Sequence, residues 1–411
     1  MSIFSEWLIQ TPGIGRISAY RFRNLLPNEE DFAQKIYTMS EQKLKELTEE
    51  AFQDKERADR CLQALREGRK RNPVVLSSQN RKNGIFFTCA GDPDFPERLL
   101  SIPDPPFGLF YKGRLPAGNL RSCAVIGSRM CSAYGALQAR IFARRLSQSG
   151  VQIISGMARG VDGIAGEEAA QTKDMSFAVL GGGADICYPK ENRKLYDALC
   201  RQGGVLSEYP PGTQPKAPLF PVRNRLISGL ADVLLVIEAR EKSGTLITVD
   251  RALEQGRSVY ALPGRVSDST SSGCNKLIMQ GAQIAVSPEY LLEDLLKMPA
   301  DEIVRRQAAA DDAGAPAARG ETAGKKARNH ADSGDMQTER WKLSESALLP
   351  LDAAICRALD PSTPRCIESI LPTVRKELGA RASYADIMRG ITMLIVRGFV
   401  KEIRTGYYIT R

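Results

Sequence analysis

Four short turns rich in glycine, serine and threonine have the residue types suited to binding an anion. Glycine lets a phosphate approach the backbone closely, exposed N–H groups donate hydrogen bonds to it, and hydroxyls add further donors. Any strand-to-helix connection favours glycine and serine, so one such turn is weak support, whereas four at one sheet edge predict a phosphate-bearing ligand. Each turn follows a run of apolar residues, and the four are Gly127-Ser128-Arg129, Ser155-Gly156-Met157, Gly181-Gly182-Gly183 and Ser243-Gly244-Thr245.

Basic side chains accompany these turns. A guanidinium group binds phosphate in a bidentate manner, and several cationic sites in a line suit a strand of phosphates better than one nucleotide. Taken singly, each basic residue has an alternative explanation as a surface charge or a helix cap. Taken together at one predicted edge, they favour the phosphate-binding interpretation. They are Arg129 after the first apolar run, Lys190 and Lys194 on either side of Glu191-Asn192, and Arg223-Asn224-Arg225 after Phe220-Pro221.

Several kinds of catalysis lack the residues they need. The sequence contains neither G-x-x-x-x-G-K-[ST] nor G-x-G-x-x-G, which disfavours P-loop chemistry and ordinary dinucleotide binding. The single histidine, His330, lies in a stretch of unstructured composition, which argues against histidine-based catalysis and His-ligated metals. The nine cysteines are scattered and never spaced as C-x-x-C, so we expect reduced thiols. We therefore predict no catalytic residue, no metal and no cofactor.

Other polar and aromatic side chains near the predicted strand ends have structural explanations. Tyr188 and Tyr209 adjoin the predicted edge and are either core residues or surfaces on which bases stack. Five carboxylates are interpreted as helix caps or ion-pair partners of nearby arginines: Asp162, Glu208, Asp232, Glu238 and Asp250.

Composition and charge narrow the class of protein further. The 411 residues are 43% hydrophobic and 26% charged, which is typical of a globular chain with more than one domain. The formal net charge is +9, and residues 111–298 carry 23 basic against 17 acidic side chains. An excess of this sign suits a polyanionic partner, although a solvated basic surface is the alternative. Because no long apolar run or signal-peptide pattern occurs, we expect a soluble, cytoplasmic protein with no membrane partner.

Six short, β-rich apolar runs alternate with helical stretches after Arg121. Continuous apolar strands between helices indicate a parallel sheet that is covered on both faces. We therefore predict an α/β fold with a Rossmann-like, doubly wound parallel sheet, whose site lies at the carboxyl ends of the strands. The runs are residues 123–126, 151–154, 177–180, 205–208, 233–238 and 258–262.

Changes in composition predict four segments. Residues 1–72 have helical spacing around a Pro12-Gly13-Ile14-Gly15 turn, typical of a helix-hairpin-helix or SAM-like domain. That turn either offers backbone amides to a DNA phosphate or serves only to connect two helices. Residues 73–298 contain the Rossmann-like domain, and the Ala- and Gly-rich residues 299–341 are a flexible linker. Residues 342–411 end in helix, glycine, strand, turn, strand, which predicts a winged helix.

The chain resembles the DNA-processing protein A family, also called DprA or Smf, over nearly its whole length. The motifs that carry the resemblance are DPDFPERLLSIPDPPFGLFYKG, AVIGSR, SGMARGVDGIA, LGGGADICYPKEN, LSEYPPGTQP, FPVRNRLISGL, EAREKSGTLIT, ALEQGRSVYALPG and SSGCNKLIMQGA. The resemblance implies an extended Rossmann fold that binds single-stranded DNA. It also implies a homodimer that protects incoming strands during natural transformation and loads the RecA recombinase onto them, with single-strand binding protein as a further candidate partner.

Matching motif to motif, the resemblance also implies which residues contact DNA. Lys194 is added because it lies on the first turn of the helix that follows YPKEN. Two departures from the family pattern are small: Val161 replaces a frequent isoleucine, and Gly181-Gly182-Gly183 stands where G-x-G is usual. The implied DNA-binding residues are Ser128, Arg129, Ser155, Gly156, Lys190, Asn192, Lys194, Arg223, Asn224, Arg225, Ser243, Gly244 and Thr245.

Two other functions compete with a non-enzymatic DNA-binding role. The Rossmann core also resembles the lysine-decarboxylase-like phosphoribohydrolases, which bind nucleoside monophosphates and cleave off the base. Their P-G-G-x-G-T-x-x-E motif ends in a glutamate, but Thr248 stands at that position here, which argues against this chemistry. The second alternative is a regulator that binds DNA through the winged helix and senses a nucleotide with the Rossmann core.

Overall fold

The structure is a computed structural model that describes most of the chain. The described residues are 3–27, 31–297, 350–359, 365–378, 400–404 and 407–410, together with Ile387, Gly390, Ile391 and Leu394. The chain divides into two compact units, which lie within residues 1–316 and 317–411. The predicted linker, residues 299–341, and His330 lie outside the described residues. No described helix is both long enough and apolar enough to span a membrane.

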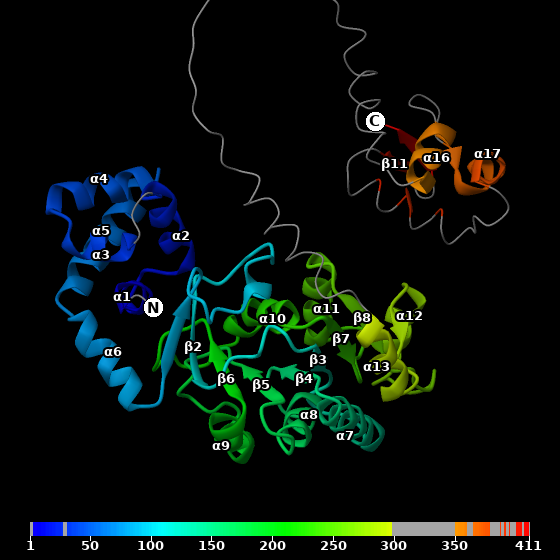
Figure 1. Ribbon diagram of the computed structural model, residues 1–411, viewed down its shortest axis with the longest axis horizontal. Coiled ribbons are helices and arrows are strands. Elements are labelled where there is room, and N and C mark those ends of the chain that lie inside the picture. The colour runs from blue at the N-terminus through cyan, green and yellow to red at the C-terminus, as the bar shows by residue number, and fades with distance from the viewer. Residues whose placement is uncertain are drawn as a thin grey trace, which may run out of the picture. The chain divides into compact units, whose positions relative to one another are not determined.

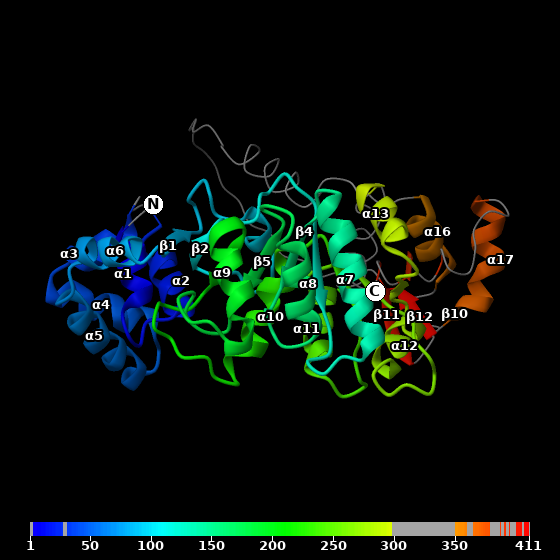
Figure 2. The same cartoon turned by 90° about the horizontal axis from the view of Figure 1, so that it is seen from below.

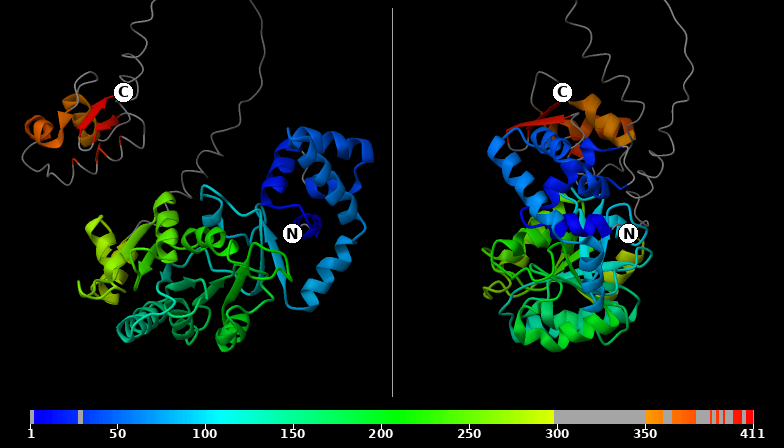
Figure 3. Two further views of the ribbon diagram at one scale, coloured as in Figure 1. Left: turned by 180° about the vertical axis from the view of Figure 1, so that it is seen from behind. Right: turned by 90° about the vertical axis from the view of Figure 1, so that its left-hand side faces the viewer.

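Six helices form the N-terminal part of the first unit (Figure 3). Polar caps begin several of them: Asp31 and Asp54 accept backbone N–H groups of α3 and α5, and Asn72 caps α6 ahead of Pro73. The predicted boundary at residue 72 falls between α5 and α6. The helices are α1 (Ile3–Gln10), α2 (Arg16–Leu25), α3 (Phe32–Thr38), α4 (Glu41–Ala51), α5 (Lys55–Arg69) and α6 (Pro73–Lys82).

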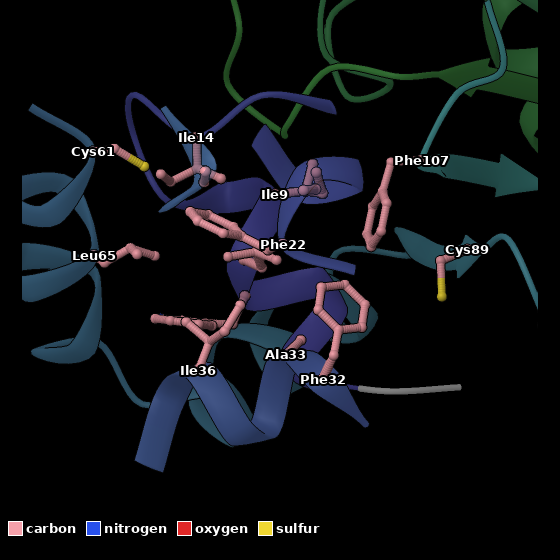
Figure 4. Close-up of a cluster of buried hydrophobic side chains, with 14 of the residues drawn as sticks. Ile9, Ile14, Phe22, Phe32, Ala33, Ile36, Cys61, Leu65, Cys89 and Phe107 are labelled. Atoms are coloured by element: carbon pink, nitrogen blue, oxygen red, sulfur yellow. The ribbon is translucent and has the colours of Figure 1, made fainter. Parts of the chain in front are cut away.

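These helices share one hydrophobic core with the edge of the sheet. Ile14 from the α1–α2 turn, Phe22 from α2 and Leu65 from α5 point into the same cluster (Figure 4). Phe107 and Phe110, which belong to the sheet side, are buried in it as well. The helical segment is therefore fixed to the sheet by common packing.

The first unit contains a sheet of nine strands. In the order β1-β2-β6-β5-β4-β3-β7-β8-β9, the seven strands from β6 to β9 are parallel, and β1 and β2 extend the sheet antiparallel. All six predicted runs contain strands, and β1, β2 and β9 are additional. The strands are β1 (Phe86–Cys89), β2 (Gly108–Gly113), β3 (Ser122–Ile126), β4 (Gln152–Ser155), β5 (Ser176–Val179), β6 (Gly204–Ser207), β7 (Val233–Val236), β8 (Ser258–Ala261) and β9 (Gln283–Ile284).

Helices cover both faces of this sheet (Figures 1 and 2). Along β3, Cys123 and Val125 pack toward α7, α8 and α13, whereas Ala124 and Ile126 pack toward α10, α11 and α12. This confirms the predicted doubly wound architecture. The helices and 3-10 turns are η1 (Glu97–Leu99), α7 (Ala133–Gln148), α8 (Val161–Ala169), η2 (Lys190–Asn192), α9 (Arg193–Gln202), α10 (Leu219–Gly229), α11 (Gly244–Glu254), α12 (Ser272–Met279) and α13 (Pro288–Lys297).

The strand order creates a switch point at β3. The chain runs from β3 to its neighbour β4 on one side, and later returns to β7 on the other side. In open α/β sheets the loops diverge at such a point and leave a crevice outside the carboxyl ends of the two strands. Here that crevice lies between the loops that follow β3 and β7.

The second unit has a small sheet and helices of its own. Its strands pair antiparallel in the order β10-β12-β11, and Ile355, Ile370 and Val374 contribute to a separate core. The assignment of this unit as a winged helix stays a prediction. The described elements are α16 (Pro350–Ala358), β10 (Arg365–Cys366), α17 (Ile367–Leu378), β11 (Val400–Arg404) and β12 (Tyr407–Thr410) (Figure 2).

Candidate nucleic-acid interface

A cleft of about 650 Å³ opens at the carboxyl ends of β3 and β7. The loop after β3, the N-terminal turns of α8, α10 and α11, and the loop after β7 line it. We call it the switch-point cleft. Seven of the thirteen predicted DNA-binding residues belong to its lining: Ser128, Arg129, Arg223, Asn224, Ser243, Gly244 and Thr245.

Close backbone packing fixes the loop after β3. The Ser128 carbonyl accepts the N–H of Val161 at the start of α8 (3.2 Å), and the Ser128 hydroxyl accepts the N–H of Met130 (3.2 Å). Gly160 makes this approach possible. Its φ is +72°, and a Cβ there would lie 2.2 Å from the Ser128 carbonyl oxygen. The sequence therefore holds the Ser128–Arg129 backbone against α8 and leaves the Arg129 side chain exposed.

Arg129 combines a free charge with an aromatic surface. Its guanidinium carbon lies 5.7 Å from the centre of the Phe220 ring, and Phe220 stacks on Tyr188 at 5.6 Å. No carboxylate of the described residues lies within ion-pair distance of Arg129. A phosphate can bind such a cation, and the neighbouring rings offer a face on which a base can stack.

A buried charge pair shapes the turn after β4. The Asp162 carboxylate accepts the Gly156 N–H (2.9 Å), while Arg223 donates to the carbonyls of Gly156 (2.9 Å) and Val179. Burial raises the pKa of Asp162 and lowers that of Arg223 to about 10. Asp162 and Arg223 therefore both bind the backbone at Gly156, and these hydrogen bonds fix the shape of the site.

Asn192 also acts on this turn. Its Nδ2 donates to the carbonyls of Met157 (3.0 Å) and Ala158 (3.1 Å), and Met157 has a φ of +52°. The side-chain amide thus stabilises a backbone conformation that is uncommon for a residue other than glycine. Ser155 is buried and accepts the Met157 N–H (3.3 Å).

The remaining predicted residues lie outside the lining of the switch-point cleft. Lys190 and Lys194 are exposed on η2 and the first turn of α9. Arg225 is 4% exposed and donates to Glu208 (2.6 Å) and Asp104 (3.0 Å). The structure therefore gives Arg225 a stabilising role between α10 and two carboxylates.

Sequence reasoning missed two cations of the cleft. Arg240 and Lys242 line it, are exposed, and have no carboxylate partner among the residues that the structure describes. The signal was present in EAREKSGT, where both residues directly precede the Ser243 cap of α11. Together with Arg129 they place three unneutralised charges at the crevice.

The lining offers little for acid–base chemistry. Asp162 is its single carboxylate, and that group is buried against Gly156. Thr248 is 3% exposed in the same lining. The described residues contain no cluster of three or more His, Cys, Asp or Glu side chains that could hold a metal ion. Two of the carboxylates predicted as helix caps or arginine partners do pair with an arginine: Asp232 with Arg98 and Glu208 with Arg225. Glu238 instead accepts hydrogen bonds from Ser132.

Known proteins resemble this chain in the region that contains the cleft. The sequence model of the family described as DNA recombination-mediator protein A matches residues 86–296, about half of the chain. The chain belongs to this family. The resemblance to DprA and Smf that the motifs predicted is thus confirmed, and the matched range contains every residue that lines the switch-point cleft.

The alignments with individual relatives cover different fractions of this chain and of the relative. Protein Smf of Escherichia coli is 46% identical over 202 residues, which are 49% of this chain and 54% of that protein. DNA processing protein DprA of Streptococcus pneumoniae is 43% identical over 203 residues, which are 49% of this chain and 72% of that protein. The X-ray structure of the pneumococcal protein superposes with a TM-score of 0.60 at 32% identity and covers 71% of this chain and 98% of its own. The chain thus spans about half the length of the Escherichia coli Smf protein.

Proposed function

We propose that this protein processes DNA by binding a single strand through phosphate contacts in the switch-point cleft. The observation that carries the proposal is the set of three exposed, unneutralised cations, Arg129, Arg240 and Lys242, around a cleft with a stacked Tyr188–Phe220 pair. Cations bind the backbone regardless of base, and aromatic rings stack on any base, so this combination suits a single strand of any sequence. The names of the relatives, DNA processing protein and recombination mediator, support the same role.

The protein acts in this proposal without catalysis. It protects the incoming strand and loads RecA onto it during natural transformation, with single-strand binding protein as a further partner and the cytoplasm as the location. The alternative phosphoribohydrolase role has little support, because the cleft has no accessible carboxylate and Thr248 occupies the place of the glutamate.

A titration with fluorescent dT oligonucleotides of increasing length, at several salt concentrations, tests the proposal. We expect affinity to rise with length and to fall with salt, because each neutralised phosphate releases counterions. Nucleoside monophosphates should displace the strand poorly. Saturation by a single nucleotide, with efficient monophosphate competition, would contradict the proposal and favour a small-molecule site. Length-dependent binding makes RecA loading on the same strands the next measurement.

A homodimer is part of the same proposal. The sheet ends at β9, a two-residue edge strand that contains exposed Ile284, and Met279 and Val286 on either side of it along the chain are exposed as well. An apolar edge of this kind is suited to pairing with a second copy. We expect light scattering at micromolar concentration to give twice the 45.1 kDa mass of the chain. A monomeric mass would count against the dimer and leave the DNA site untouched.

A further inference from the structure

A second cleft, of about 790 Å³, lies between the N-terminal helices and the loop that follows β6. We call it the hairpin cleft, because the Pro12-Gly13-Ile14-Gly15 turn lines it. The opposite wall is formed by residues 208–213 and Val222. We propose that a single DNA strand bound in the switch-point cleft continues into the hairpin cleft, where arginines and free backbone amides hold its phosphates. This inference rests on the proposed function.

Two arginines give the hairpin cleft its charge. Arg57 lies 4.9 Å from the centre of the Phe52 ring, and Arg71 donates to the Gln10 carbonyl (3.0 Å). Both guanidinium groups are thus positioned by neutral partners, and neither has a carboxylate within ion-pair distance among the residues described. Their full charges remain available to an anion. Arg57 lies in the first turn of α5 and Arg71 just beyond its last residue, so most of the length of this helix separates their backbones. At 1.5 Å per residue that is roughly 20 Å, which is room for more than one phosphate.

The one carboxylate in the lining does not cancel this charge. Glu208 pairs with Arg225 (2.6 Å) and lies 3.6 Å from Arg16, so two cations already neutralise it. Arg16 in turn also pairs with Asp104. The net charge that the cleft presents comes from Arg57 and Arg71.

The turn adds backbone donors to the same lining. Ile14 is 5% exposed and anchors the turn in the core, and Gly13 has a φ of +90°. No side chain caps α2, so the backbone N–H groups of residues 15–18 have no acceptor among the described atoms. The space where a Gly15 side chain would point is open for at least 4 Å. The turn therefore supplements a cleft that the two arginines already make cationic.

The two clefts share a wall. Tyr209, residues 210–213 and Val222 line the hairpin cleft, while Pro215, Phe220 and Pro221 line the switch-point cleft. One segment, from the end of β6 to the first turn of α10, thus separates the sites by the thickness of a loop. Val222 is 40% exposed on that boundary. A flexible strand that leaves the Arg129–Phe220 surface meets the hairpin cleft next.

A charge at Gly15 tests this path. Gly15 is the N-cap of α2 with extended backbone (φ −110°), so G15D and G15N should both fold, since aspartate and asparagine are good caps. The aspartate places a negative charge where we expect a phosphate. We expect G15D to bind a long dT oligonucleotide about tenfold more weakly than G15N does. The shortest dT that saturates the switch-point cleft should bind both variants equally.

A second variant measures the arginines directly. In R57Q/R71Q the dependence of log affinity on log salt should become shallower by about 1.4 for the long strand, at about 0.7 per phosphate contact. Equal long-strand binding by G15D and G15N, with an unchanged salt slope in R57Q/R71Q, would overturn the inference while leaving the proposed function intact. A wild-type protein that fails to bind even the short strand would instead overturn the proposed function. If the hairpin cleft raises the affinity for a blunt duplex of equal length as much as it raises the affinity for the single strand, the continuous single-strand path is wrong.

Discussion

Replacing Arg225 with methionine is expected to lower the free energy of unfolding by about 3 kcal/mol at neutral pH. Arg225 is buried on α10 and donates to Glu208 (2.6 Å) and Asp104 (3.0 Å). Methionine fills a similar volume without either donor. Glu208, whose side chain is 10% exposed, would keep only Arg16 at 3.6 Å, whereas Asp104 is 44% exposed and reaches water. The loss of stability therefore comes from the buried Glu208 carboxylate. Chemical unfolding followed by circular dichroism measures the free energy of unfolding of both proteins.

The pH dependence of this loss identifies its cause. Burial raises the pKa of Glu208 above its ordinary value of 4.5, and the nearby Arg225 offsets only part of this rise. Without Arg225 the pKa rises further, so the folded state resists ionisation more strongly. A carboxyl with a raised pKa makes folding most favourable below its unfolded pKa, and that advantage disappears as pH rises through the folded value. The R225M penalty should thus be full at neutral pH and should shrink as pH falls toward 4.5 and below.

Two companion variants separate charge from packing. R225M/E208Q also removes the Glu208 carboxylate, which has lost its main partner in R225M. This variant should recover most of the free energy of unfolding that R225M loses, because a buried neutral amide costs less than a buried charge. R225K keeps a positive charge and should lie between wild type and R225M. An R225M penalty of equal size at both ends of the pH range would assign the loss to packing and contradict the ion-pair explanation.

The second large effect concerns binding. We expect R129Q/R240Q/K242Q to weaken single-strand affinity at least about a hundredfold, since each charged hydrogen bond contributes about 1.5 kcal/mol. The salt dependence should become shallower by about 2, at about 0.7 per contact. All three residues are exposed and lack carboxylate partners among the described residues, so the fold should tolerate the change. Fluorescence titration at several salt concentrations gives both values.

A control with the same change in net charge is available. Arg114, Arg145 and Lys297 are exposed, lie outside the lining of both clefts, and pair with Asp174, Glu289 and Glu293. Exposed ion pairs contribute little to stability, so R114Q/R145Q/K297Q should fold normally. We expect its affinity to fall far less than that of the cleft variant. Equal losses in both would mean that overall charge drives binding and that the switch-point cleft is not the site.

The sequence by itself determined the central architecture. Each of the six apolar runs is long enough for one buried strand, and the helical stretches between them require right-handed crossovers, so a doubly wound parallel sheet follows from local pattern alone. The glycine- and serine-rich turns after β3 and before α11 were correctly placed at one edge, because the carboxyl ends of parallel strands meet there. The family resemblance rested on the same motifs.

Only the tertiary structure decided which polar side chains face the crevice. Arg223, Asn224 and Arg225 are consecutive, but successive residues of a helix point about 100° apart. Arg223 and Asn224 therefore both line the cleft, Arg223 with its guanidinium group bound to backbone carbonyls, whereas Arg225 points away from the cleft to Glu208. Asn192 lies far along the chain from the turn whose carbonyls it binds. Packing between distant segments also decides whether a short strand such as β9 forms. The same is true of the α1–α2 turn, which lines one cleft together with the loop after β6. Local residue patterns do not encode such contacts.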